Sequence, residues 1–205
     1  MLNPYNHKFP EDKPVDRLQD DCIHITDEMP RFLVESIGLE AGRRVLDASC
    51  DPGRLLPYLK TKLQRTGHIF ILNPSRAECG KSADSERVTE LNASADNIPL
   101  GDSAVDFIIC LSSFNGFLNR EAVVFEFFRI LKPGGKTMIV HCGWEKTPSF
   151  VERNTMTIGL PPCPAGLNAV FSTAGFFRNN IIYLPNWFVF TANKRGHSLG
   201  GGRVI

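Results

Sequence analysis

The chain has 205 residues, of which 42% are hydrophobic and 22% are charged. These proportions exclude an intrinsically disordered chain, and the length suits one domain with a core of its own. The 23 Lys and Arg nearly balance the 22 Asp and Glu, which leaves a net charge of +1 and excludes a strongly basic nucleic-acid-binding surface. No apolar run approaches the ~20 residues of a membrane span, so neither nucleic acid nor membrane is expected as a partner.

The N-terminal sequence and the cysteines bear on location and on metal binding. The first eight residues lack the apolar stretch of a secretory signal. The six cysteines are spread along the chain without a C-x-x-C pair, which predicts reduced thiols in a cytoplasmic protein. Cys22 with His24 and His141 with Cys142 are neighbouring Cys/His pairs, but no second pair at ligand spacing accompanies them, so no metal site is expected.

The first part of the chain differs in composition from the remainder. Residues 1–27 are polar and contain three prolines, which predicts an irregular leader that could close over a bound substrate as a lid. A helix is expected from there to Gly38, a residue suited to ending it. We therefore place the start of the folded domain at residue 28.

Short apolar strands then alternate with amphipathic helices. The expected strands are 44–47, 68–72, 87–91, 105–111 and 136–141. Helices are expected from Asp51-Pro52 to Gly67, from Asn73-Pro74-Ser75, and from 120 to 132, where Pro133-Gly134-Gly135 follows. Asp51 and Asn73 are predicted to cap the first two of these helices. Such alternation is typical of a parallel sheet with helices on both faces.

The last third predicts a different connection. A helix over 167–173 ends at Gly175, and two apolar strands, 180–184 and 187–191, flank Pro185-Asn186 as a hairpin. The fold class is therefore α/β, a Rossmann-like, doubly wound sheet of seven strands, mostly parallel and ending in an antiparallel hairpin. We expect one domain over 28–193 and a flexible tail over 194–205.

Five segments, in this order, resemble motifs of the class I S-adenosylmethionine (SAM)-dependent methyltransferases. They are Val45-Leu46-Asp47 through Gly53 (V-L-D-x-G-x-G-x-G), Ala93 through Leu100 (G-D-A-x-x-L-P-F), Ser103 through Ile109 (S-F-D-x-V), Arg129 through Gly135 (R-x-L-K-P-G-G) and Ala174-Gly175-Phe176 (A-G-F). The resemblance covers about residues 28–193. It implies SAM as the cofactor, bound at the carboxyl ends of the strands, where open α/β sheets hold their ligands. The cofactor-binding positions it implies are Asp47, Ser49, Asp51, Gly53, Asn73, Ser94, Ala95 and Leu111.

Four of these positions depart from the family pattern. Ser49 and Asp51 stand where the family has glycines, and Asp51 adds a carboxylate near the expected place of SAM's own carboxylate. Asn73 replaces the acidic residue that accepts both ribose hydroxyls, and Ser94 replaces the aspartate that resembles the adenine-reading group. The loss of two charge-assisted contacts at ~1.5–3 kcal/mol each would weaken binding by roughly two to four orders of magnitude. Restoring the family residues at the four positions is expected to create binding if the cleft is merely eroded.

The acceptor side offers fewer candidates. Methyl transfer from SAM depends mainly on positioning, so no strong base is required. Asn115, in the loop after the 105–111 strand, could orient an acceptor, and His141, near the end of the 136–141 strand, could act as a base. Structural roles for both, in a turn and in the interior respectively, stay open.

Three functions are compatible with these residues. The first is methyl transfer from SAM to a small-molecule acceptor, by a chain that could form a homo-oligomer. The second is a catalytically inactive binding or regulatory subunit with an eroded SAM site, paired with an active methyltransferase homologue. The third is an enzyme whose altered site takes a different nucleotide or metabolite.

Overall fold

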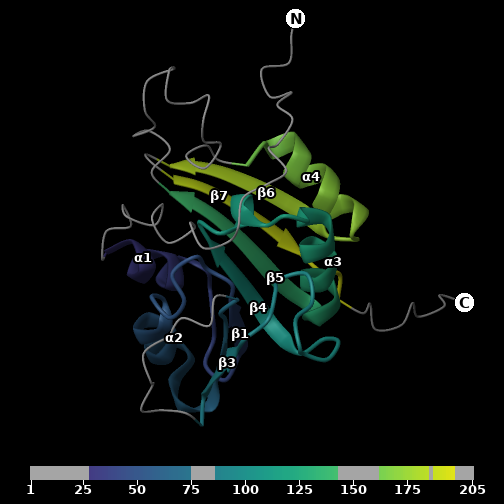
Figure 1. Cartoon of the computed structure of the whole chain (residues 1–205). Helices are drawn as coiled ribbons and strands as arrows, with labels where there is room; N and C mark the ends of the chain where they lie inside the picture. The colour runs from purple at the N-terminus through teal and green to yellow at the C-terminus, as the bar shows by residue number, and fades with distance from the viewer. Residues whose placement is uncertain (1–27, 75–85, 143–161, 185–186, 197–205) are drawn as a thin grey trace, which may run out of the picture.

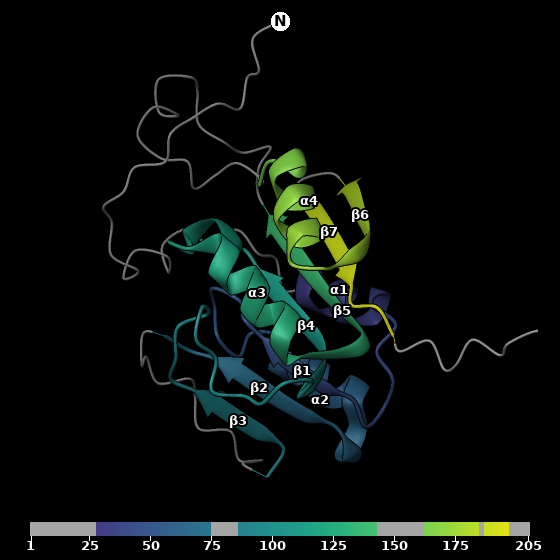
Figure 2. The same ribbon diagram turned by 90° about the vertical axis from the view of Figure 1, so that its right-hand side faces the viewer.

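The computed structural model describes residues 28–74, 86–142, 162–184 and 187–196. Seven strands form one sheet in the order β3-β2-β1-β4-β5-β7-β6. Helices cover both of its faces (Figures 1 and 2). This is the doubly wound α/β architecture that the alternation of strands and helices predicted.

The five parallel strands are β1 (Arg44–Asp47), β2 (His68–Leu72), β3 (Val88–Leu91), β4 (Val105–Leu111) and β5 (Leu131–Cys142). Four of the five lie close to the expected positions, and the fifth, β5, begins five residues before its predicted start and includes Pro133-Gly134-Gly135. All four neighbouring pairs among the five strands are parallel. Their carboxyl ends therefore meet at one edge of the sheet, which we call the carboxyl edge.

The last two strands form an antiparallel pair, as the Pro185-Asn186 turn predicted. In β6 (Phe177–Leu184) and β7 (Trp187–Asn193), Leu184 pairs with Trp187 and the register is antiparallel. In the sheet, β7 lies between β5 and β6 and is antiparallel to β5, so β6 forms the edge of the sheet. The turn residues themselves, 185–186, lie outside the described residues.

Two apolar clusters fill the space between the sheet and its helices. One lies under α3 (Arg120–Ile130) and α4 (Pro164–Thr173) and includes the fully buried Phe127 and Phe171. The other lies under α1 (Glu28–Ser36) and α2 (Leu56–Leu63) and includes the fully buried Leu55 and Leu59. Because the parallel strands are apolar on both faces, each cluster removes one face from water.

The α2 helix begins later than predicted. Residues 51–55 form a turn in which the Arg54 amide donates to the Asp51 carbonyl oxygen at 3.2 Å, and the helix starts at Leu56 without a side-chain cap. Asp51 is therefore not its N-cap, contrary to the prediction. The physical reason is Gly53, whose φ of +87° lies in the left-handed region that a right-handed helix excludes.

Smaller differences concern other element ends. The α3 helix ends at Ile130, so Leu131 already belongs to β5, whereas the prediction carried the helix to residue 132. The α4 helix starts at Pro164, in the first turn where proline is tolerated, three residues before the predicted start. Three predicted segments lie wholly or largely outside the described residues: the leader 1–27, the helix predicted to begin at Asn73-Pro74-Ser75, and most of the tail. Of that helix, only residues 73 and 74 are described before residue 86.

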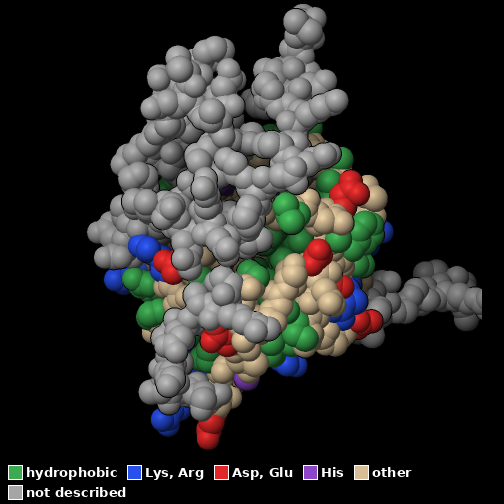
Figure 3. Space-filling model, in the orientation of Figure 1, with side chains coloured by type: hydrophobic (Ala, Val, Ile, Leu, Met, Phe, Trp, Pro, Cys, Tyr) green, Lys and Arg blue, Asp and Glu red, His purple; other side chains and the backbone are tan. Residues whose placement is uncertain are grey.

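The surface agrees with the near-neutral charge of the chain. Figure 3 shows acidic and basic side chains interspersed over the described part of one face. No helix in the described ranges combines the length and the apolarity needed to cross a membrane.

Candidate functional site

Polar residues gather at the carboxyl edge of the parallel strands. Asp47 ends β1, Asn73 follows β2 and His141 lies near the end of β5, and all three are buried. Buried polar groups are uncommon and are normally bonded, so a cluster of them at one sheet edge indicates a site. This edge is also where ligands of open α/β sheets bind.

Asp47 is the most deeply buried carboxylate of this edge. Its exposed fraction is 1%, and its Oδ1 accepts a hydrogen bond from the Ser49 amide at 3.1 Å. Its Oδ2 has no hydrogen-bond partner among the residues that the structure describes. Burial raises the pKa of Asp47 to about 6, hydrogen bonds from Ser49 act against that rise, and the nearby charge of Asp51 adds to it.

Two serines fasten the turn after β1 to β4. The Ser49 hydroxyl accepts from the Leu111 amide at 3.2 Å, and the Ser113 hydroxyl donates to the Ala48 carbonyl oxygen at 2.5 Å. The Cys50 amide donates to the Leu111 carbonyl oxygen at 3.0 Å. Ser49 is thus bonded to the neighbouring strand, and Leu111 contributes its backbone here while its side chain packs in the core.

Asp51 does not stand alone as a negative charge. Its Oδ2 lies 3.3 Å from Nη1 of Arg54, and the Asp51 side chain is 45% exposed. The ion pair offsets the repulsion expected between Asp51 and an anionic ligand. Gly53, two residues on, provides the left-handed backbone of the turn.

Asn73 is fully buried and contacts the neighbouring strand. Its backbone N–H donates to the Leu91 carbonyl oxygen at 2.9 Å. Its side-chain NH₂ donates to Oε1 of Glu90, an exposed residue of β3. A carboxylate therefore lies directly beside the position where the resemblance led us to expect one.

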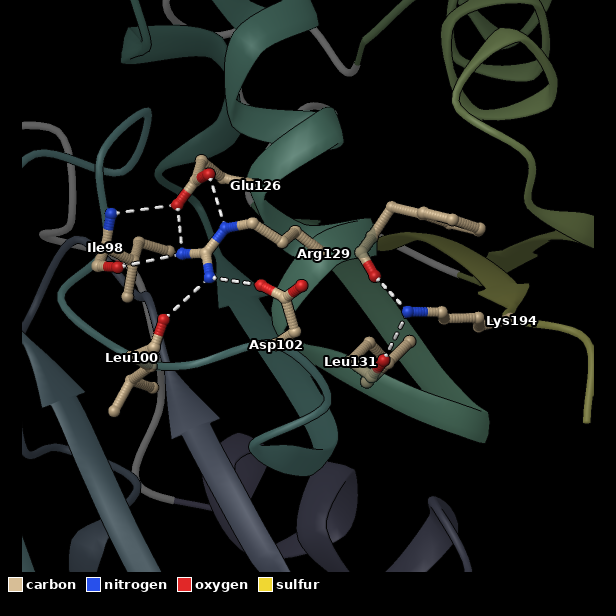
Figure 4. A network of polar contacts seen from close by, with 8 residues as sticks. Ile98, Leu100, Asp102, Glu126, Arg129, Leu131 and Lys194 are labelled. Carbon is tan, nitrogen blue, oxygen red and sulfur yellow. Dashed lines mark hydrogen bonds and ion pairs between the residues drawn. The ribbon is translucent and has the colours of Figure 1, made fainter.

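The segment after β3 is held by a network that the sequence reasoning missed (Figure 4). Arg129 of α3 donates to the carbonyl oxygens of Ile98 and Leu100 at 3.0 and 2.7 Å, and to the carboxylates of Glu126 and Asp102 at 2.8 and 2.9 Å. Glu126 also accepts from the Ile98 amide at 3.0 Å. A signal was available, since Glu126 and Arg129 lie at helical i,i+3 spacing.

That network positions the two remaining cofactor candidates. Ser94 and Ala95 lie in the same segment, Ser94 exposed and Ala95 buried. The Asn97 amide donates to the Ser94 carbonyl oxygen at 3.1 Å and closes a turn. The Ser94 side chain is thus available to a ligand, whereas Ala95 packs into the core.

The two acceptor-side candidates come from neighbouring strands. Asn115 lies in the short 3₁₀ helix η4 (Phe114–Gly116), whose carbonyl oxygens at residues 114 and 115 accept from Arg120 at 3.3 and 2.7 Å. His141 is 6% exposed. The Ser112 amide donates to the Val140 carbonyl oxygen at 2.7 Å, which brings the loop after β4 against the end of β5.

The cysteines differ from expectation at one position. Cys50 is disulfide-bonded, whereas Cys110 and Cys163 are free. The prediction that all six thiols are reduced is therefore wrong for Cys50. Within the described ranges no group of three metal-binding side chains occurs.

A surface cavity of about 650 Å³ lies elsewhere, between α1 and α2. Three of its lining residues, Leu39, Ala41 and Gln64, lie in the connections that lead into β1 or β2. The cavity is lined by Arg31, Val34, Glu35, Leu39, Ala41, Tyr58, Thr61, Lys62 and Gln64. The cavity contains none of the sequence-predicted site residues.

Comparison with known proteins supports the same family. Residues 46–139 match the family described as a methyltransferase domain. The ubiquinone/menaquinone biosynthesis C-methyltransferase UbiE of Shewanella pealeana is 27% identical over 117 residues, which are 54% of this chain and 47% of that protein. UbiE of Syntrophotalea carbinolica is 28% identical over 119 residues, 56% and 50% of the two chains. The chain spans about half the length of the curated relatives it matches.

A solved structure extends the likeness to the whole fold. A SAM-dependent methyltransferase from Aquifex aeolicus superposes with a TM-score of 0.70 at 18% identity, covering 89% of this chain and 99% of that chain. The expected fold class is thereby confirmed.

Proposed function

We propose that this chain, whose residues 46–139 match the methyltransferase-domain family and whose fold resembles that of a solved SAM-dependent methyltransferase, binds SAM at the carboxyl edge and transfers its methyl group to a small-molecule acceptor. The observation that carries the proposal is the buried Asp47 carboxylate, whose Oδ2 has no partner in the described part of the chain. A buried acceptor without a partner is costly for the fold. A ligand donor at this oxygen would offset that cost.

The other residues of the edge fit the chemistry of SAM. Its ammonium group and ribose hydroxyls are donors, and the edge offers the acceptors Asp47, Asn73 and Glu90. Arg54 neutralises Asp51 near the expected place of the SAM carboxylate, so that Asp51 need not repel this group. The altered glycine position Ser49 is fastened to β4 by its hydroxyl. These contacts favour a site in which other residues of the chain replace the contacts of the family pattern over a site that has lost its ligand.

The bound SAM would supply a methyl group on a positively charged sulfur. An acceptor atom would bond to the methyl carbon from the side opposite the sulfur, which leaves as the thioether of S-adenosylhomocysteine. The protein's part is to hold the two reactants in register and to exclude water. The loop after β4, fixed by Arg120 through the carbonyl oxygens of η4, would form the acceptor side. We assign Asn115 to orienting the acceptor and His141 to accepting a proton where the acceptor releases one.

Calorimetric titration with SAM and S-adenosylhomocysteine tests the proposal. We expect micromolar dissociation constants for the wild type and at least a tenfold loss for Asp47→Asn, because one charge-assisted contact contributes ~1.5–3 kcal/mol. Glu35→Gln, an exposed carboxylate on α1 that lines the other cavity, is the matched control and should bind normally. No heat at millimolar ligand would reject the proposal.

The acceptor is sought by release of S-adenosylhomocysteine in the presence of candidate compounds. Because the relatives are named as C-methyltransferases of quinone biosynthesis, activated ring carbons of phenols and quinols are the first class to test. Turnover should fall in Asn115→Ala and His141→Ala while the affinity for S-adenosylhomocysteine is retained.

We also propose a cytoplasmic location, supported by the scattered spacing of the six cysteines. The reducing cytoplasm would keep Cys110 and Cys163, which are free in the structure, as thiols. Trapping thiols in intact cells and counting them by mass spectrometry tests this; an oxidised Cys110 or Cys163 in freshly trapped protein would contradict it.

A further inference from the structure

We propose that Glu90 of β3 is the charged ribose acceptor of this site and that Asn73 acts as its positioning residue. The inference rests on the proposed function and names a residue outside the motifs that resemble the methyltransferases. In effect, the carboxylate expected at the end of β2 would have moved to the neighbouring strand.

The strand register places the two side chains on one face of the sheet. Ile71 pairs with Glu90, and the Asn73 amide donates to the carbonyl oxygen of Leu91. Since side chains alternate along a strand, Asn73 lies on the same face as Ile71, and so does Glu90. The β2–β3 pairing therefore places the two side chains near enough for the contact that they make.

The chemistry of the contact sets the direction of both groups. Asn73 has only donors on its nitrogen and only an acceptor on its oxygen. Because the nitrogen donates to Glu90 Oε1, the amide oxygen is turned away from the carboxylate. An ionised carboxylate has about four acceptor positions, so Glu90 can accept further hydrogen bonds beyond the one from Asn73.

The different burial of Asn73 and Glu90 suits them to different roles. Asn73 has an exposed fraction of 0%, whereas Glu90 is exposed. The buried amide can fix its neighbour, and the exposed carboxylate can reach a ligand without the cost of fully burying a charge.

This arrangement reverses one expectation from the family pattern. Asn73→Asp would place a second carboxylate against Glu90, and like charges in contact oppose ionisation. We therefore expect that substitution alone to weaken binding. The exchanged pair, Asn73→Asp with Glu90→Gln, restores one charge and one amide and should recover much of the affinity.

The experiment measures two ligands against four variants by calorimetry. The ligands are S-adenosylhomocysteine and its 2′,3′-dideoxy analogue, which differ only in the ribose hydroxyls. The variants are Glu90→Gln, Asn73→Asp, the exchanged pair, and the control Glu86→Gln, which removes an exposed carboxylate before the other end of β3. Thermal denaturation checks that each variant is folded.

We expect Glu90→Gln to weaken S-adenosylhomocysteine binding roughly 10- to 100-fold and to leave the dideoxy analogue within about twofold of the wild type. The control should change neither affinity. An equal loss for both ligands, no loss for either, or tighter binding by Asn73→Asp alone would overturn the role of Glu90 while leaving SAM binding in place. Failure of the wild type to bind S-adenosylhomocysteine would instead reject the proposed function, and this inference with it.

Discussion

Asp47 combines burial, a hydrogen bond from the Ser49 amide and an Oδ2 that has no partner among the described residues. Burial raises its pKa to about 6, so at neutral pH the fold holds a charge that it disfavours. A cationic donor at Oδ2 would stabilise the ionised form. The same residue thus links ligand binding, stability and pH.

The pH dependence of binding and stability is a consequence of that link. The affinity for S-adenosylhomocysteine should rise with pH through about 6 and then level off, whereas Asp47→Asn should bind weakly at every pH. Between about pH 4 and 6 the folded chain holds a proton on Asp47 that the unfolded chain has released. The wild type should therefore lose on the order of 2–3 kcal/mol of stability relative to Asp47→Asn as the pH rises from 4 to 7.

Calorimetry and urea denaturation across pH 4–8 measure both effects. If the variant showed the same pH dependence of affinity as the wild type, another group would be responsible.

Sequence motifs located part of the site and could not determine its contacts. Asp47 and Asn73 stand at the ends of β1 and β2, and Gly53 stands in the turn after β1, where the resemblance placed them. The bond of Ser49 to Leu111 depends on the β1–β4 pairing, and the bond of Asn73 to Glu90 joins residues 17 apart through the β2–β3 register. Such contacts are set by neighbouring strands, and local spacing contains no information about them.

At the scale of elements, the segment after β3 depends on one arginine of α3. Arg129 joins two backbone carbonyls to two carboxylates, and its hydrogen bond to Glu126 is the largest cause of its raised pKa. Lys194, after β7, donates to the carbonyl oxygens of Phe128 and Leu131 at 2.7 Å each and so closes the end of the same helix. The helix and the segment are therefore expected to move together.

Arg129→Lys tests this coupling. Lysine keeps the charge but lacks the planar fork that reaches both carbonyl oxygens. We expect a stability loss of about 1–3 kcal/mol and weaker binding of S-adenosylhomocysteine, measured by denaturation and calorimetry. Arg31→Lys, in an exposed i,i+4 pair with Glu35, should change stability by less than about 0.5 kcal/mol; an equal effect of the two substitutions would contradict the proposed coupling.

Gly135, in the first half of β5, tests how tightly the amino ends of the strands are packed. A Cβ at Gly135 would lie 2.8 Å from Leu131 Cγ and 2.9 Å from the Asp106 carbonyl oxygen. Asp106 itself is fixed, because its Oδ2 accepts from the Arg44 amide at 2.8 Å and from Lys132 at 2.9 Å. The backbone therefore has little room to yield.

Gly135→Ala should lower the free energy of unfolding by roughly 1–3 kcal/mol through overpacking. Gly101→Ala is the control, since a Cβ there meets nothing within 4 Å. Chemical denaturation of both variants measures the difference, and a neutral Gly135→Ala would show that the β4–β5 packing can yield more than these distances imply.

At the scale of the molecule, the order of apolar strands and helices was sufficient to predict the sheet and its reversal. Most strand positions were marked by a short apolar run, and Gly or Pro marked several boundaries, such as Gly67 before β2 and Pro185 after β6. The start of α2 was predicted wrongly because an N-cap pattern at Asp51-Pro52 gives no indication that Gly53 adopts a positive φ. The layered fold is thus determined by the pattern of apolar residues along the chain, whereas the local geometry of the turn over residues 51–55 depends on the conformation of Gly53.

The central claim is that the carboxyl edge, and not the cavity between α1 and α2, receives the adenosyl ligand. Hydrogen exchange with and without S-adenosylhomocysteine tests it most directly, since backbone amides report their position along the chain. We predict slower exchange over residues 47–53 and 90–98 and unchanged exchange over 31–41 and 58–64. Protection confined to the latter two segments, or to none of the four under saturating ligand, would contradict the claim.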